Sequence, residues 1–411
     1  MAPGDLKELI PNANAAELEL VAQYGALPED ARRERAFAAF AETGLPHRRM
    51  EAWKWTDFKA KLPAIEAPEG GARPDPFETI DGPVIRFGPG GMEKSETLPE
   101  GLNLFVKDEA QAFGAAEDMP LGAVTAALAG GRQGPAALMI EVTEPVGTPL
   151  RLVFAADRAE LNFSRITVLV RPGARLHLIE SHLGGAGFAS HLTDLAVQEG
   201  GALSRTLYQS AGTDAAQAIT ADVHVESKAR FEQVSLAFGA GVSRLETRLT
   251  HQGREAEARL DAAYLAGEGR HVDITTHVRH GAESCVTHQL NKGAVSAGGR
   301  GVFQGKFHVP RIVGQYTDAD MQHHALLLEN GAEVDAKPEL EIYADDVECA
   351  HGNTCGALDD DQLFYLRQRG LPEAEARAVL TEAFIAEALE ALPEDLRDIL
   401  RGEAADWLAA G

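Results

Sequence analysis

Turn-forming residue pairs recur through the middle of this chain at intervals of 25 to 28 residues. The pairs begin at Gly173, Gly201, Lys228, Gly253, Gly281 and Gly331, and the last interval, of 50 residues, is twice 25. Most of the pairs precede a short segment in which apolar and polar residues alternate, which is the period of a half-buried strand. A repeat of this length, built from strands and turns without helices, is typical of a β-solenoid, in which each coil buries its inner face against its neighbours.

The alternation is clearest in residues 219–226 and 271–278. In the first segment Ile219, Ala221 and Val223 alternate with polar residues, and the second has the same pattern. No long helical pattern separates these strands, which disfavours a doubly wound α/β fold. An antiparallel sandwich is the remaining alternative, but it would place turns every 8 to 12 residues. The pattern therefore favours a mainly β fold with a parallel β-helix over residues 76–347.

Helical patterns precede the repeat. Pro28 and Asp30 open a segment that contains Phe37 and Phe40 and ends before Gly44, which predicts a helix. The aromatic residues at 53, 55 and 58 indicate either a local aromatic core or a docking surface. Residues 63–89 are dense in proline and glycine, which predicts a connector. We assign residues 1–75 to an N-terminal helical domain and linker.

Helical patterns also follow the repeat. The segment 359–370 has acidic residues at its start and Arg367 and Arg369 before Gly370, as a helix dipole favours. Two further helices are expected after Pro372 and Pro393. Residues 358–411 carry 13 acidic and 5 basic side chains. We predict that residues 348–411 form an acidic helical domain that caps the solenoid and hides the apolar face of its last coil.

Charge and motifs exclude several functional classes. With 63 acidic and 38 basic residues the formal net charge is −25, which opposes binding to nucleic acid or to an anionic membrane. The N-terminus lacks the pattern of a secretory signal, and the odd count of 3 cysteines favours a reducing compartment, so we expect a cytoplasmic protein. No P-loop, G-x-S-x-G, H-E-x-x-H or paired C-x-x-C motif is present.

Cys349 and His351 are the candidate ligands. Their spacing of two residues would place a sulfur and an imidazole nitrogen on the same face of a strand. Thiolate and imidazole suit iron, zinc or an iron–sulfur cluster. Two ligands cannot complete such a site, so a neighbouring coil or another subunit would have to supply the others. The alternative is a buried cysteine beside a hydrogen-bonded histidine at the end of a strand.

Other residues are weaker candidates. Cys355 lies six residues from Cys349, and Cys285 is expected on the strand face opposite Val286 and Leu290. The adjacent His323 and His324 would point in opposite directions on a strand. The remaining histidines are expected on outward strand faces as surface residues. The acidic residues around the candidate site could attract a cation or could form a solvated turn; they are Asp345, Asp346, Glu348 and Asp359 to Asp361.

Two stretches resemble a known family. KPELEIYADDVECAHGNTCGALDDDQLFYLRQRGL, residues 337–371, closely resembles the C-terminal signature of the SufB/SufD family, the scaffold subunits of the SUF iron–sulfur cluster assembly system. GLPHRRMEAWKWTDF, residues 44–58, resembles its N-terminal marker. The CAHG sequence matches the SufD branch, because the SufB branch carries a glutamate-containing stretch there. Cys355 departs from the small aliphatic residue expected at its position.

The resemblance implies a fold, partners and roles. It implies a right-handed parallel β-helix between helical domains, and a non-catalytic scaffold subunit in a complex with SufB and two copies of the ABC-type ATPase SufC. SufC would bind the C-terminal helical domain, and SufB would meet the last coils edge to edge. Cys349 and His351 would take part in iron acquisition or cluster formation at that interface. The sequence leaves open a reduced flavin in the complex, a homodimer without partners, and a β-helix enzyme acting on carbohydrate or acyl groups.

Overall fold

The computed structural model describes residues 10, 12–62, 73–88, 91–107, 118–129, 137–156 and 161–410. The first part of the predicted connector, residues 63–72, lies outside the described residues, as does residue 89. The connector is shorter than predicted, because strand β1 already begins at Val84.

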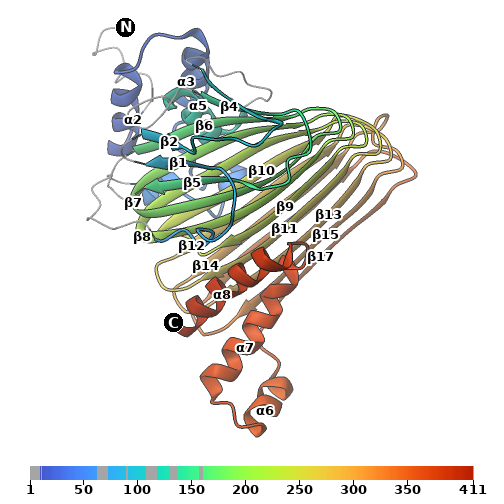
Figure 1. Ribbon diagram of the computed structural model, residues 1–411. Helices are drawn as coiled ribbons and strands as arrows, with labels where there is room; N and C mark the ends of the chain where they lie inside the picture. The colour runs from blue at the N-terminus through green and yellow to red at the C-terminus, as the bar shows by residue number, and fades with distance from the viewer. Residues whose placement is uncertain are drawn as a thin grey trace.

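The strands wind into a parallel β-helix of about eight turns, which confirms the predicted mainly β fold (Figure 1). From β7 onward all pairings are parallel, and two ladders run side by side: β8–β10–β12–β14–β16 and β9–β11–β13–β15–β17. The only antiparallel pairs among the described strands are β1–β2 and β3–β4. The strands are β1 (Val84–Gly88), β2 (Gly91–Lys94), β3 (Leu102–Lys107), β4 (Ala137–Val142), β5 (Leu150–Ala156), β6 (Leu161–Val170), β7 (Arg175–Val197), β8 (Ala202–Val225), β9 (Arg230–Ala237), β10 (Val242–His251), β11 (Glu257–Ala266), β12 (His271–His280), β13 (Val286–Val295), β14 (Arg300–Val309), β15 (Asp318–Leu327), β16 (Glu333–Ile342) and β17 (Glu348–Gly356).

One corner of the solenoid repeats from coil to coil with a left-handed backbone conformation. Each corner residue before the last coil donates its N–H to a carbonyl at the same corner of the next coil; Gly200 bonds Ser227 at 3.0 Å and Lys228 bonds Arg254 at 2.9 Å. The corner residues, with φ between 55° and 71°, are Gly173, Gly200, Lys228, Glu255, Ser284, Tyr316 and Asp346. The predicted turns from Gly173 to Gly281 fall at this corner.

The sixth predicted turn, at Gly331, belongs to a different corner. There the N–H of Gly269 bonds the carbonyl of Gly298, and the N–H of Gly298 bonds the carbonyl of Gly331, each at 3.2 Å. The 50-residue interval is therefore not two units of 25. The last coils are longer, because a loop precedes β15 and separates the corner residues Ser284 and Tyr316 by 32 positions.

The N-terminal segment packs on an outer face of the β-helix. Helix α2 (Ala15–Gly25) has a capping box at Asn14, and α3 (Ala31–Thr43) ends at Gly44 as predicted. Their apolar faces join α5 (Pro120–Leu128) and strands β7 and β8 in one core. In the sequence, the short helices η1 (Glu51–Trp53) and α4 (Phe58–Lys61) lie between α3 and α5.

Trp53 and Phe58 belong to a local core, as the first of the two sequence interpretations held. Both side chains are buried, and their rings meet edge to face at 5.9 Å. Trp53 also stacks on the guanidinium of Arg244, at 3.8 Å, and Arg244 is paired with Glu246 and Asp273, each at 3.0 Å. The segment is thereby fixed to β10 and β12.

The C-terminal helices lie along the side of the solenoid. They are α6 (Asp360–Gln368), α7 (Glu373–Ala386), η3 (Glu387–Leu389) and α8 (Glu394–Ala410). Leu389, Leu396 and Leu400 pack on Leu236, Phe238 and other outward residues of the β9–β17 ladder. The prediction that this domain caps the last coil is therefore wrong: β16 and β17 stay largely uncovered. Strand pairing also continues to Gly356, beyond the predicted domain boundary at 347. No helix in the described ranges is long and apolar enough to cross a membrane.

The placement of the remaining histidines differs from the prediction. His182, His191, His251 and His280 are buried inside the solenoid, and His271 is buried beneath the N-terminal segment, where Nε2 lies 3.0 Å from Thr56 Oγ1. In this interior, side chains at equivalent positions of successive coils lie in rows, and neutral imidazole rings can stack within these rows. His182 stacks on Phe154 of the preceding coil at 4.5 Å, and His251 stacks on His280 at 5.1 Å.

A glycine substitution tests the corner packing. A Cβ atom at Gly253 would collide with the backbone nitrogen of Ser227, whereas one at Gly147 would meet no atom within 4 Å. We expect Gly253→Ala to lower the free energy of unfolding in urea by about 1–3 kcal/mol. The control Gly147→Ala should change it by less than about 0.5 kcal/mol. Equal effects of the two substitutions would contradict this account of the corner.

The buried histidines predict acid sensitivity. Burial lowers the pKa of His271, His277, His280 and His323 to about 4. Between pH 6.5 and 4 the folded state therefore binds fewer protons than the unfolded state, so stability falls as the pH decreases through this range. Each fully titrating histidine contributes up to about 1.4 kcal/mol per pH unit.

Urea titrations at pH 7.5 and 5.5 measure this loss. His280→Gln should reduce the difference between the two pH values, while His288→Gln, at an exposed position of β13, is the matched control. A free energy of unfolding that does not change between these pH values would show that the buried histidines are not held neutral.

Candidate functional site

The candidate site lies at the open end of the solenoid. β16 pairs with β14, and β17 pairs with β15, and no further described strand follows either of them. Both ladders therefore end with one unpaired backbone edge. The inner face of this last coil has no following coil to cover it, and most residues of β17 are exposed.

Cys349 and His351 occupy the inward face of β17. Cys349 is in register with Ala319, and His351 with Met321, and both of these β15 residues are buried in the main core. In β13 the same two positions are filled by Thr287 and Gln289. On the last coil Cys349 is half-buried against that core and His351 is exposed. The two side chains thus share one face of a strand, about 7 Å apart along it.

The thiol of Cys349 is protonated at neutral pH in this environment. Burial raises its pKa, and the nearby charge of Asp318 raises it further. A metal ion that binds the sulfur must therefore displace a proton. All three cysteines are free; burial raises the pKa of Cys285 to about 11 and also raises that of the exposed Cys355.

Cys349 and His351 do not form a complete metal site. Within the described ranges no group of three or more His, Cys, Asp or Glu side chains is arranged to hold a metal ion. The acidic residues at 345, 346, 348 and 359–361 are exposed. Asp359 instead caps α6, where its side chain accepts the N–H of Gln362 at 2.9 Å. The assignment of Cys349 and His351 as ligands therefore stays a prediction that requires ligands from elsewhere.

The adjacent His323 and His324 have different surroundings. His323 is buried and bonds Tyr264 and Asn353, at 2.9 and 2.7 Å, whereas the half-buried His324 bonds Thr354 at 2.7 Å. Sequence reasoning missed Asn353, which shares the inward face of β17 with His351 and Cys355. The signal was present, since residues 349, 351, 353 and 355 all carry polar or sulfur-containing side chains at the period of a strand.

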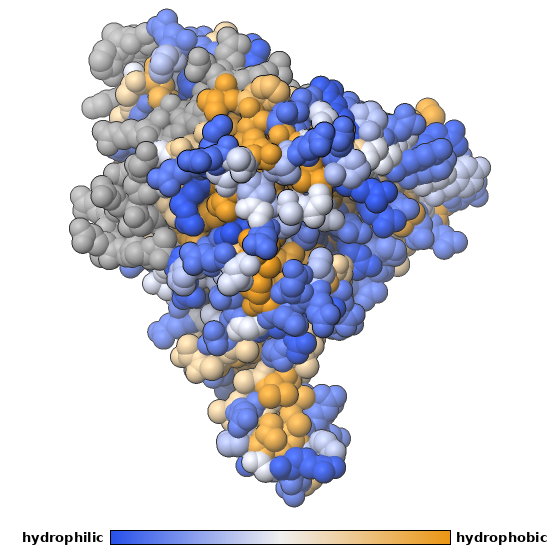
Figure 2. Space-filling view, in the orientation of Figure 1, coloured by the Kyte–Doolittle hydropathy of each residue, from blue (hydrophilic) through white to orange (hydrophobic). Residues whose placement is uncertain are grey.

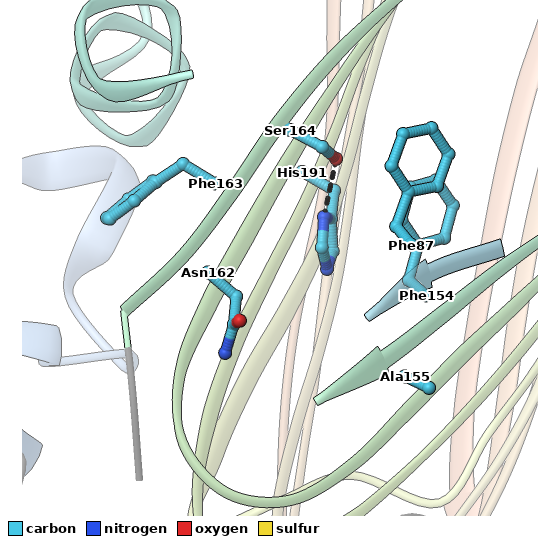
Figure 3. A pocket seen from close by; sticks show the side chains of 7 residues that line it. All are labelled: Phe87, Phe154, Ala155, Asn162, Phe163, Ser164 and His191. Carbon is cyan, nitrogen blue, oxygen red and sulfur yellow. Dashed lines mark hydrogen bonds between the residues drawn. The ribbon is translucent and has the colours of Figure 1, made fainter. Parts of the chain in front are cut away.

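A small cavity lies at the other end of the solenoid, between its first coils (Figure 3). It has a volume of about 20 Å³ and is lined by Phe87, Phe154, Ala155, Asn162, Phe163, Ser164 and His191. Ser164 and His191 are joined by a hydrogen bond of 2.7 Å, which is drawn as a dashed line. The nearby carboxylate of Glu180 bonds His182 and Arg205 rather than His191, so these residues do not form a serine–histidine–acid triad.

The family model "SUF system FeS cluster assembly, SufBD core domain" matches residues 153–384, which include most of the solenoid, Cys349 and His351. Iron-sulfur cluster assembly protein SufD of Escherichia coli is 39% identical over 161 residues, 39% of this chain and 38% of that protein.

Two further relatives also match parts of this chain. The SufBD family protein slr0076 of Synechocystis is 36% identical over 170 residues, 40% of this chain and 36% of that protein. The chloroplastic protein ABCI7 of Arabidopsis thaliana is 28% identical over 252 residues, 60% of this chain and 53% of that protein. The matched regions thus span between about a third and a half of these relatives. From the core-domain match over more than half of its length, the chain belongs to the SufBD family of the SUF iron–sulfur cluster assembly system.

Proposed function

We propose that this protein is a non-catalytic scaffold subunit on which a nascent iron–sulfur cluster is built, in a cytoplasmic complex with a SufB-type and a SufC-type subunit. The observation that carries the proposal is the position of Cys349 and His351 on the uncovered inner face of the last coil. A metal-binding pair that lacks further ligands of its own is suited to a site shared between two subunits.

The end of the solenoid supports a partner with the same architecture. The free edges of β16 and β17 offer backbone N–H and C=O groups to added strands. A SufB-type solenoid that pairs with these edges would bring its own side chains opposite Cys349 and His351. Iron and sulfide would then be the cargo of a site that neither subunit forms alone.

The C-terminal helices support a second partner. α6 and α7 form a hairpin that extends away from the solenoid (Figure 1), and apolar side chains gather on its surface (Figure 2). Phe364 and Tyr365 are 64% and 57% exposed. Exposed aromatic side chains on a projecting element are typical anchors of protein interfaces. A SufC-type ATPase that binds this hairpin could transmit its movement through α7 and α8, which pack on the β-helix.

Replacement of the candidate ligands tests the site. We expect His351→Ala and Cys349→Ser to reduce the iron and sulfide content of the reconstituted complex at least several-fold, because each removes one ligand. Both lie at the uncovered end, so His351→Ala should change the free energy of unfolding by less than about 0.5 kcal/mol. His324→Ala, one strand away, is the control. Normal cluster content in both variants would refute the assigned roles.

Native mass spectrometry with the SufB and SufC of the same genome tests the partners. We expect a complex of one SufB, two SufC and one copy of this chain. The double variant Phe364→Ala/Tyr365→Ala should retain SufB and lose one SufC, whereas Phe105→Ala, a partly exposed phenylalanine of β3, should retain both. A chain that remains a monomer or a homodimer in this mixture would refute the complex.

A further inference from the structure

A chain of polar side chains runs through the interior of the solenoid to its open end. The hydroxyl oxygen of Tyr264 lies 2.9 Å from Nε2 of His323, and Nδ1 of His323 lies 2.7 Å from Oδ1 of Asn353. Tyr264 and His323 have no exposed surface, whereas Asn353 is exposed on the last strand. The three residues come from β11, β15 and β17.

The surrounding coils are shaped to accommodate this chain. The ring of Tyr264 extends along the solenoid axis over the intervening coil, where a Cβ atom at Gly293 or Gly301 would collide with it. The imidazole of His323 stacks on the ring of Phe303, with centroids 4.7 Å apart and planes within 4°. Both rings are therefore held in one orientation.

The hydrogen bonds have one consistent direction. Burial raises the pKa of Tyr264, so its hydroxyl keeps its proton, and burial lowers the pKa of His323 to about 4, so its ring carries one N–H at neutral pH. If Tyr264 donates to Nε2, the ring proton lies on Nδ1 and is donated to Oδ1 of Asn353. In the opposite direction the Tyr264 proton would need another acceptor, and among the described residues the hydroxyl has no partner other than His323.

The result is a fixed amide at the open end. Oδ1 of Asn353 is occupied by His323, which leaves the two N–H groups of the amide for acceptors on the uncovered side. Asn353 lies on the same face as His351 and Cys355, about 7 Å from each along the strand.

A stability role alone does not account for this chain. Some neighbouring inward positions are apolar, such as Ala262, Met321 and Ala325, although Asn291 of the intervening coil is polar. Buried polar groups can often be replaced by apolar ones without loss of stability. A polar chain that ends on an exposed amide is better explained by a requirement at that end.

We propose that Asn353 donates N–H···S hydrogen bonds to an anionic sulfur, either a cysteine thiolate or an inorganic sulfide, of the cluster assembled at this end, and that Tyr264 and His323 are the positioning residues of its amide. This inference rests on the proposed scaffold function. Hydrogen bonds to sulfur favour the more negatively charged state of a cluster and so raise its reduction potential.

The test is an anaerobic reconstitution of the complex of this chain, SufB and SufC with Fe²⁺ and sulfide, followed by a redox titration monitored by electron paramagnetic resonance. We expect Asn353→Ala and His323→Leu to lower the equilibrium constant for reduction about tenfold, the effect of one lost charged hydrogen bond, or about 59 mV for one electron. His323→Asn should restore the potential, because its amide N–H can replace Nδ1–H. His324→Leu is the control.

The outcomes separate the inference from the function on which it rests. Potentials of Asn353→Ala and His323→Leu equal to that of the wild type would overturn the inference alone. A wild-type complex that assembles no cluster would overturn both. If His323→Leu does not fold, Asn353→Ala, at an exposed position, decides the question.

The same measurement in the Cys355→Ser variant identifies the sulfur that accepts the hydrogen bond from Asn353. If Asn353→Ala no longer shifts the reduction potential once Cys355 is replaced by serine, the acceptor is the Cys355 thiolate. A shift that persists assigns it to another sulfur of the cluster, and either result supports the donor role of Asn353.

Discussion

Parallel backbone pairing between successive coils is the constraint on which the rest of this structure depends. Each strand fills its hydrogen bonds with the strands of the coils before and after it, so a position in one coil is stacked on the equivalent position in the next. Rows of side chains therefore extend along the solenoid axis. Aromatic rings and neutral histidines stack within these rows. A polar residue in the interior finds its partner in a neighbouring coil, as Glu180 does with Arg205, or on its own strand, as His182 does with Glu180.

The same constraint leaves backbone groups unpaired and side chains uncovered at the end of the solenoid. The pairing that satisfies β15 has no continuation beyond β17, and the row that holds Ala319 and Met321 in the core ends on Cys349 and His351. Side chains that would be sealed in any earlier coil thus become available to a partner. The helices that could have covered this end lie along the side instead, which leaves the edges of β16 and β17 uncovered and the α6–α7 hairpin projecting from the solenoid.

The N-terminal segment adds a second attachment across the ladder β10–β16. The backbone carbonyl of Ala52 accepts from Arg244 at 2.9 Å and from Gln304 at 3.2 Å, and Glu51 is paired with Lys337 of β16 at 3.1 Å. The two stretches that carry the family resemblance are therefore linked in space, although about 280 residues separate them. Removal of one member of the buried Arg244 cluster would leave an uncompensated charge, at a cost of about 3–5 kcal/mol.

The sequence by itself determined the features that depend on local periodicity: the recurring turns, the alternating strands, the helix boundaries at Gly44, Asp359 and Pro372, and the shared face of Cys349 and His351. Only the tertiary structure decided which residues meet across coils. It placed histidines in the interior, laid the C-terminal helices along the side rather than over the end, and joined Tyr264, His323 and Asn353, whose sequence separations are 59 and 30 residues. These contacts depend on the length of each coil and on the register of non-adjacent strands, and a change of one residue in either would turn an inward side chain outward.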